Sequence, residues 1–152
     1  MSDVTISKAF VAKMMDHAVL KPAMTDEDIR KNAAMCVAKG VGDLCVRPTD
    51  AALAAQLLKG TGTTVAVVIG FPHGASRSEV KALEARLAIE DGADELDMVM
   101  NIGKFLSGDY DYVKRDIEAV VAVAKPKGVL VKVIQESCLL TLEQVAKACE
   151  LS

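Results

Sequence analysis

The chain has 152 residues, enough for one domain with a buried core. Its formal net charge of −3, a pI near 5.4 and the lack of a basic stripe argue against nucleic acid or an anionic membrane as a partner. Aromatic residues make up only 3% and there is no tryptophan, so Ala, Val, Leu, Ile and Met have to build the core. This composition is typical of helices packed on parallel strands.

The four cysteines are Cys36, Cys45, Cys138 and Cys149. They form no C-x-x-C pair and have no histidine at zinc spacing, so we expect no metal site and a reducing compartment. Lys8, Lys13 and Asp16 interrupt the N-terminal apolar runs before these reach the length of a signal-peptide core. No run approaches the roughly 20 apolar residues of a membrane span. These features predict a cytoplasmic protein.

Apolar residues at helical spacing predict a first helix over residues 3–15. Thr25 and the acids after it predict a second helix that ends at Gly40. Strands are then expected at 43–46, 64–69, 95–100 and 129–134, and helices at about 49–59, 76–91, 109–124 and 141–151. Such alternation indicates βαβ units and a parallel sheet. No linker divides the sequence, so residues 1–152 are expected to form a single domain.

Two architectures fit this order of elements: an open doubly wound sheet, or part of a closed (β/α) barrel. The open fold predicts a glycine-rich phosphate loop after the first strand, but residues 46–50 contain no glycine. The glycines at positions 70 and 74 match such a loop poorly. We therefore expect an α/β protein of the (β/α) TIM-barrel type. A full barrel needs eight units and about 250 residues; about four units are expected here, a half-barrel preceded by N-terminal helices.

Asp97 is the first candidate catalytic residue. In an alternating strand, Leu96, Met98 and Met100 share one face, and Asp97 and Asn101 share the other. If the methionine face packs on helices, Asp97 points into the barrel, where an unpaired carboxylate is costly. The alternative is a structural acid that only holds a neighbouring strand.

Lys132 is the second candidate, because valines flank it in the interior of an expected strand. Burial lowers the pKa of a lysine, and a neutral amine can attack a carbonyl or accept a proton. The alternative is that Lys132 is only the ion-pair partner of Asp97 on the adjacent strand. An acid–lysine pair inside a parallel barrel suits proton transfer next to a carbonyl.

Other polar residues fall where barrel enzymes build their sites, at the carboxyl ends of strands. These are Arg47, Asn101, Gln135 and Glu136. Cys45 joins the same layer only if the strand register allows it. His17 and His73 are more simply explained as solvated or structural residues than as catalysts.

Six segments resemble the deoxyribose-phosphate aldolase family. They are residues 15–22 (MDHAVLKP), 44–48 (LCVRP), 68–72 (VIGFP), 92–103 (GADELDMVMNIG), 107–110 (SGDY) and 132–141 (KVIQESCLLT). The resemblance runs in order from about Met15 to the last residue.

The resemblance implies a class I aldolase on a (β/α)₈ barrel. Such an enzyme cleaves 2-deoxy-D-ribose 5-phosphate to glyceraldehyde 3-phosphate and acetaldehyde through a lysine imine, without a metal or organic cofactor. It also implies that Asp97 is the proton-relay aspartate and that Lys132 is a pocket-lining lysine rather than the imine lysine. Asp16 and Cys45 match further pocket positions, and we add Asn101 to this set.

The sequence departs from the family pattern in two ways. Ala18 replaces a threonine, which affects fine substrate contacts. The K-T-S-T-G-like segment of the imine lysine and the phosphate-binding glycines do not occur in residues 1–152. We therefore expect the 152-residue chain to match an N-terminal portion of the family and to be inactive alone.

A half-barrel leaves two strand edges unpaired, so we expect a homo-oligomer, a dimer through these edges, or else an aggregation-prone monomer. The alternative function is a non-catalytic barrel fragment that acts as an interaction or oligomerisation module.

Overall fold

The computed structural model describes residues 6–152, so the start of the helix expected at 3–15 lies outside the described residues. The strands are β1 (Asp16–Val19), β2 (Asp43–Val46), β3 (Thr64–Ile69), β4 (Glu95–Val99) and β5 (Leu130–Ile134). The α-helices are α1 (Lys8–Lys13), α2 (Asp26–Lys39), α3 (Ala51–Leu58), α4 (Ser78–Glu90), α5 (Ile102–Leu106), α6 (Tyr110–Ala124) and α7 (Leu142–Leu151). Within the described part of the chain, no helix combines the length and the hydropathy that crossing a bilayer requires.

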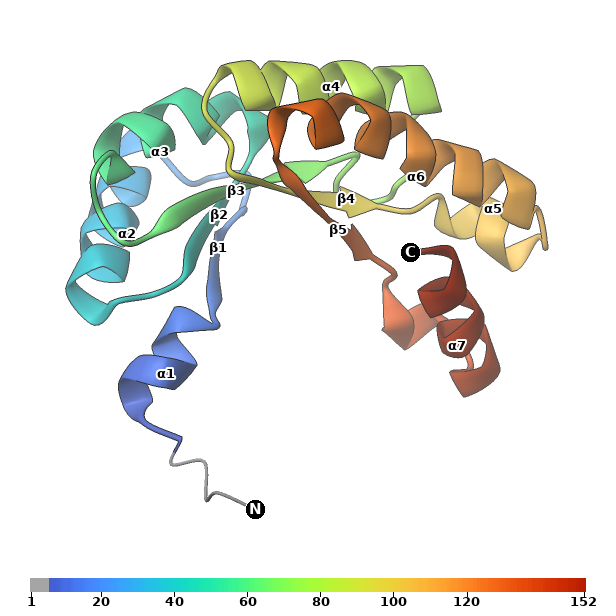
Figure 1. Cartoon of the computed structure of the whole chain (residues 1–152), viewed down its shortest axis with the longest axis horizontal. Coiled ribbons are helices and arrows are strands. Elements are labelled where there is room, and N and C mark those ends of the chain that lie inside the picture. Colours follow the sequence, from blue (N-terminus) through green and yellow to red (C-terminus); the bar gives the residue numbers. More distant parts are fainter. Residues whose placement is uncertain (1–5) are drawn as a thin grey trace.

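The five strands form one parallel sheet in the order β1-β2-β3-β4-β5. Helices α2, α3, α4 and α6 form an arc outside the sheet, whereas α1 and α7 extend from its two ends (Figure 1). Sequential parallel strands with a helix on each crossover are the arrangement of a (β/α) barrel. The expected α/β fold of TIM-barrel type is confirmed, as part of a barrel.

The sequence-based prediction of four strands was wrong by one, because β1 lies in the stretch between the two predicted N-terminal helices, to which no element was assigned. Of its four residues only Val19 is buried, and Asp16 and His17 give no apolar alternation. The strand forms because its backbone pairs with β2 over the whole stretch from Asp16 to Val19. The second helix, α2, is therefore the crossover between β1 and β2, and from residue 6 onward α1 alone precedes the sheet.

The outward faces of the strands build the core with the helices. Leu96 and Met98 of β4 are completely buried among apolar side chains of the helix layer, as the alternation predicted. Helix α2 begins at a capping box made by Thr25 and Asp28 and ends at Gly40, whose φ of 66° is left-handed. These local signals fix the helix ends, and burial of the apolar face supplies most of the stabilisation.

A buried ion pair joins the helix layer to the end of β4. Lys81 of α4 and Asp116 of α6 are both fully buried, and their side chains meet at 2.5 Å. Nζ of Lys81 also donates to the carbonyl of Val99 at 2.8 Å, and the Ser78 hydroxyl donates to Asp116 at 2.8 Å. The pair therefore ties α4, α6 and the carboxyl end of β4 together.

The turn after β3 lies directly against the end of β4. Gly74 has a φ of 64°, and a Cβ at this position would collide with the carbonyl oxygen of Met100. Glycine therefore serves two needs here, a left-handed backbone and a close approach of two main chains.

Candidate active site

The inner face of the sheet gathers several carboxylates around Lys132. Strand register places Lys132 of β5 beside Asp97 of β4, as expected for neighbouring strands. Nζ of Lys132 donates a hydrogen bond to Asp16 of β1, and lies 3.0 Å from Oε2 of Glu95 and 3.1 Å from Oδ1 of Asp97. One ammonium is thus shared by three carboxylates from two other strands.

Asp97 is the most buried acid of this cluster, with 8% of its surface exposed. Its Oδ1 contacts Lys132 as an ion pair but at a poor angle, and within residues 6–152 this buried oxygen has no hydrogen bond. Its Oδ2 accepts the thiol hydrogen of Cys45 at 3.5 Å. The register of β2 therefore brings Cys45 into the cluster, and Ala18 is its register partner on β1.

Burial and charge shift the proton affinities of the cluster. Burial raises the pKa of Asp97, and the charge of Lys132 offsets part of that rise. Burial, helped by Asp97, raises the pKa of Cys45 to about 12. For Lys132, burial acts to lower the pKa, but the bonds to Asp16 and Glu95 and the charge of Asp97 outweigh it and raise the pKa above its ordinary value. Lys132 is therefore held as a cation.

Asn101 does not join this cluster through its side chain. Its Oδ1 accepts the backbone N–H of Lys104 and caps helix α5. The strand alternation on which it was assigned to the pocket ends at Val99, so Asn101 no longer follows it. The two histidines also lie apart from Lys132: His17 pairs with Asn32 of α2 at 2.8 Å, and His73 is exposed in the turn after β3.

Arg47, at the carboxyl end of β2, holds the segment that follows β1. Its guanidinium donates to the backbone carbonyls of Lys21 and Pro22 at 3.2 and 3.3 Å, and to that of Met24 at 3.1 Å. It also forms a 2.6 Å ion pair with Asp50. All these bonds make Arg47 a structural bridge between two loops.

A cavity of about 520 Å³ opens at the carboxyl ends of β1, β2 and β3. Its lining is Leu20, Pro22, Arg47, Pro48, Thr49, Val68, Phe71, Pro72 and Glu84. Val68 is the register partner of Asp97, so the cavity borders the acid–lysine cluster. An apolar recess with a few polar groups beside titratable residues is the usual form of a small-molecule site.

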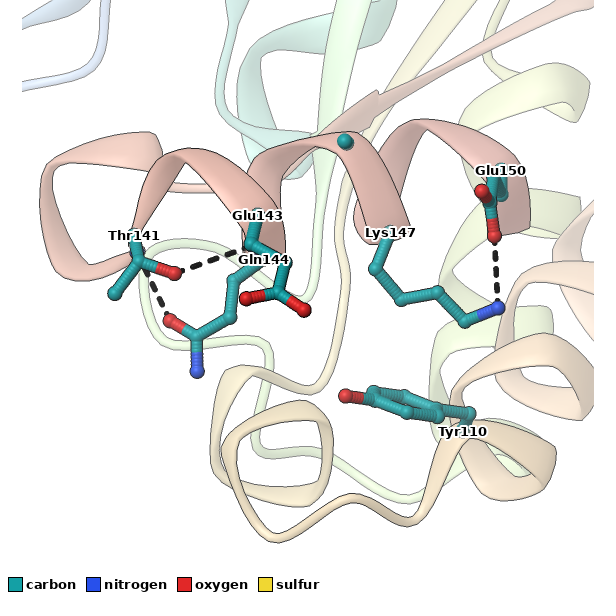
Figure 2. Close-up of a pocket in the computed structure, with 7 residues that line it drawn as sticks. Tyr110, Thr141, Glu143, Gln144, Lys147 and Glu150 are labelled. Carbon is teal, nitrogen blue, oxygen red and sulfur yellow. Dashed lines mark hydrogen bonds and ion pairs between the residues drawn. The ribbon is translucent and has the colours of Figure 1, made fainter.

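A second cavity, of about 660 Å³, lies between the start of α6 and helix α7. Figure 2 shows Tyr110 facing α7, with Lys147 paired to Glu150 at 2.8 Å and Thr141 and Gln144 forming the cap of the helix. None of the candidate residues lines this cavity. Lys147 and Glu150 neutralise each other, and the cavity holds none of the residues of the acid–lysine cluster, so the larger cavity is the weaker candidate for chemistry.

The sequence analysis missed Glu95 and Asp43. Glu95 precedes Asp97 by two positions, so strand alternation alone places both on one face and could have identified it. Asp43 lies beside Asp16 in the register of β1 and β2, and its carboxylate accepts a hydrogen bond from the hydroxyl group of Thr64. Burial raises the pKa of Asp43, and the bond from Thr64 opposes this rise. Finding Asp43 required knowledge of β1, which the sequence did not give.

Fold and site together define a (β/α)-barrel protein with an acid–lysine cluster on the inner face of its parallel strands. Comparison with known proteins identifies the family. The profile of the DeoC/LacD family of aldolases matches residues 10–148, and the chain belongs to this family.

Named relatives agree with this assignment. The chain is 56% identical over 144 residues to the deoxyribose-phosphate aldolase of Thermococcus gammatolerans, and 51% identical over 140 residues to that of Clostridium novyi. It superposes on the deoxyribose phosphate aldolase of Aeropyrum pernix, described as tetrameric, with a TM-score of 0.88 at 32% identity. The expected resemblance to deoxyribose-phosphate aldolases is confirmed.

These matches cover almost all of this chain but not all of the relatives. They include 93% of the chain and 64% of the T. gammatolerans protein, and 92% and 63% for the C. novyi protein. For the A. pernix structure the shares are 96% of this chain and 61% of that one. The chain thus spans just under two thirds of the length of these relatives.

Proposed function

We propose that the chain supplies part of a deoxyribose-phosphate aldolase site, in which Asp97 relays protons and Lys132 supports it. The observation that carries this proposal is the cluster on the inner face of the sheet, where buried Asp97 contacts both Lys132 and Cys45. Two relatives are named deoxyribose-phosphate aldolase, and the reaction that we propose is the one the family resemblance implies: reversible cleavage of 2-deoxy-D-ribose 5-phosphate to glyceraldehyde 3-phosphate and acetaldehyde.

The chemistry of the cluster suits this division of roles. The pKa of Asp97 is raised by burial, so the carboxyl group can both take up and release a proton nearer to neutral pH than an exposed aspartate can. Lys132 remains protonated among its carboxylates, and an ammonium has no lone pair with which to attack a carbonyl. Lys132 therefore orients Asp97 and neutralises its charge, while the imine is assigned to another lysine.

We propose in addition that residues 1–152 alone do not cleave the substrate, because they contain no K-T-S-T-G-like segment for the imine lysine. Incubating the 152-residue chain with acetaldehyde and borohydride, followed by peptide mass spectrometry, tests this. We expect no adduct on Lys132. An adduct there would overturn the supporting role of this residue.

A chimaera tests the positive part of the proposal. It joins this chain to the part of the T. gammatolerans aldolase that the chain does not match, and release of glyceraldehyde 3-phosphate is followed in a coupled assay. We expect cleavage that falls by roughly 10²-fold or more in Asp97→Asn and is unchanged in the exposed control Asp111→Asn. An active chimaera that tolerates Asp97→Asn would contradict the role of Asp97.

We also propose that residues 1–152 form one domain and that the 152-residue chain associates through its two sheet edges, β1 and β5. Unpaired edge strands favour pairing with further strands, here those of a second copy. Sedimentation should give a dimer, and thermal unfolding should show one cooperative transition. A clean monomer would contradict the proposed pairing. The free thiols of all four cysteines support the proposed cytoplasmic location.

The non-catalytic alternative remains testable in the same material. An interaction module predicts that Asp97→Asn leaves association unchanged and that the chimaera shows no turnover that depends on Asp97. The buried, hydrogen-bond-poor Oδ1 of Asp97 favours the enzyme part instead, since a purely structural acid is usually fully hydrogen-bonded.

A further inference from the structure

Glu95 competes with Asp97 for the charge of Lys132. Both acids belong to β4, two positions apart on the same face, and both approach the same Nζ, at 3.0 and 3.1 Å. Asp16 takes a third position on this ammonium by a hydrogen bond. One ammonium charge is therefore divided among three carboxylates, of which Asp16 accepts a hydrogen bond from it.

We propose that Glu95 is a positioning residue for this site: it holds part of the charge of Lys132 away from Asp97, so that Asp97 keeps a high affinity for its proton. The inference rests on the relay role proposed for Asp97. The side chain of Glu95 is 22% exposed, and it contacts Lys132 at the Nζ atom.

The physical argument starts from the cost of a tight ion pair. If Lys132 served Asp97 alone, the pair would stabilise the carboxylate form and Asp97 would release its proton far below neutral pH. Sharing weakens that stabilisation, and the carboxylate of Glu95 adds repulsion from about 6.6 Å along the strand. Oδ1 of Asp97, without a hydrogen bond, is then the atom at which a proton is best accommodated.

Within residues 6–152, the charged and titratable groups around Asp97 belong to the inner surface of the sheet. They are Asp16 of β1, Asp43 and Cys45 of β2, Glu95 of β4 and Lys132 of β5. Strand β3 places Val68 beside Asp97 and Ala66 beside Glu95. Asp16 also contacts Lys132, but from β1 and not from the strand of Asp97.

The test is a carboxyl ¹³C NMR titration of Asp97 in the 152-residue chain, which requires no turnover. In Glu95→Gln, which keeps the size and a hydrogen-bonding oxygen but loses the charge, the midpoint for Asp97 should move to lower pH. The proton affinity of Asp97 should fall by more than the roughly threefold that direct repulsion from Glu95 alone would give at the dielectric constant of water. The exposed control Glu118→Gln should leave the midpoint unchanged.

Two results would overturn the inference: an unmoved Asp97 midpoint in Glu95→Gln, or an equal shift when Lys132 has first been replaced in Lys132→Met. The second would show that Glu95 acts by direct repulsion and not through Lys132. If Glu95→Gln fails to fold, Glu95→Ala provides the same comparison. Because the titration is independent of catalysis, an inactive chimaera would refute the proposed function without touching this result.

Discussion

Removing one partner of the buried Lys81–Asp116 pair should destabilise the protein severely. In Lys81→Met, a side chain of similar length but no charge, Asp116 keeps only the bond from Ser78 and the carbonyl of Val99 loses its donor. Both partners are completely buried, so water cannot replace the lost ammonium. Breaking such a pair costs about 3–5 kcal/mol, a large share of the roughly 5–15 kcal/mol that stabilises a domain.

The same geometry predicts strong coupling between the two positions. The double variant Lys81→Met with Asp116→Leu removes both charges, so it should be more stable than the sum of the single effects predicts, by about 2 kcal/mol or more. Urea unfolding followed by circular dichroism gives all four free energies of unfolding. The exposed Lys114, 3.9 Å from Glu118, is the control, and Lys114→Met should cost under about 1 kcal/mol. Additive single effects, or a Lys81→Met variant no less stable than the control, would refute the reasoning.

Three further outcomes follow from features of the fold and the site. Gly74→Ala should cost about 1–3 kcal/mol more than Gly108→Ala in urea unfolding, because both have positive φ but only Gly74 meets the Met100 carbonyl; equal losses would contradict this. With iodoacetamide at mildly alkaline pH, peptide mapping should find exposed Cys138 and Cys149 modified before Cys45, since burial raises the pKa of Cys45 to about 12; equal rates would disprove it. Burial raises the folded-state pKa of Asp97, so the folded protein loses stability as pH rises through that value and the carboxyl group gives up its proton. Asp97→Asn cannot acquire this buried charge and should therefore raise the melting temperature at pH 7. The gain should shrink below about pH 3.9, the ordinary pKa of an aspartate, and a lower melting temperature at pH 7 would count against the sign.

Alternation along β4 was enough to predict which way its side chains point. Met98 is buried against the helices and Asp97 faces inward, as a period of two requires. The pairing of Asp97 with Lys132 also followed, because consecutive strands of a parallel barrel are neighbours. Local pattern and simple topology together thus predicted that Asp97 and Lys132 meet on the inner face of the sheet.

Other parts of the site depend on contacts that no local pattern encodes. Strand β1 lacks an apolar face because its inward residue, Asp16, contributes to the polar cluster instead of a core. Lys81 looks like any helix-surface lysine, since its partner Asp116 lies 35 positions later in the sequence. Asn101 lies two positions beyond the end of β4, where its side chain caps α5, and strand alternation does not reveal this.

The bonds of Arg47 define part of the wall of the 520 Å³ cavity through main-chain atoms. The guanidinium contacts carbonyl groups, which every amino acid carries, so the side chains at positions 21 and 24 are not needed to hold the loop in place. A lysine at position 47 could not span the same set of acceptors, because it lacks the planar fork of donors. The side chains of this part of the wall can therefore change while the backbone keeps its shape. This makes the segment a good starting point for redesigning what the cavity accepts.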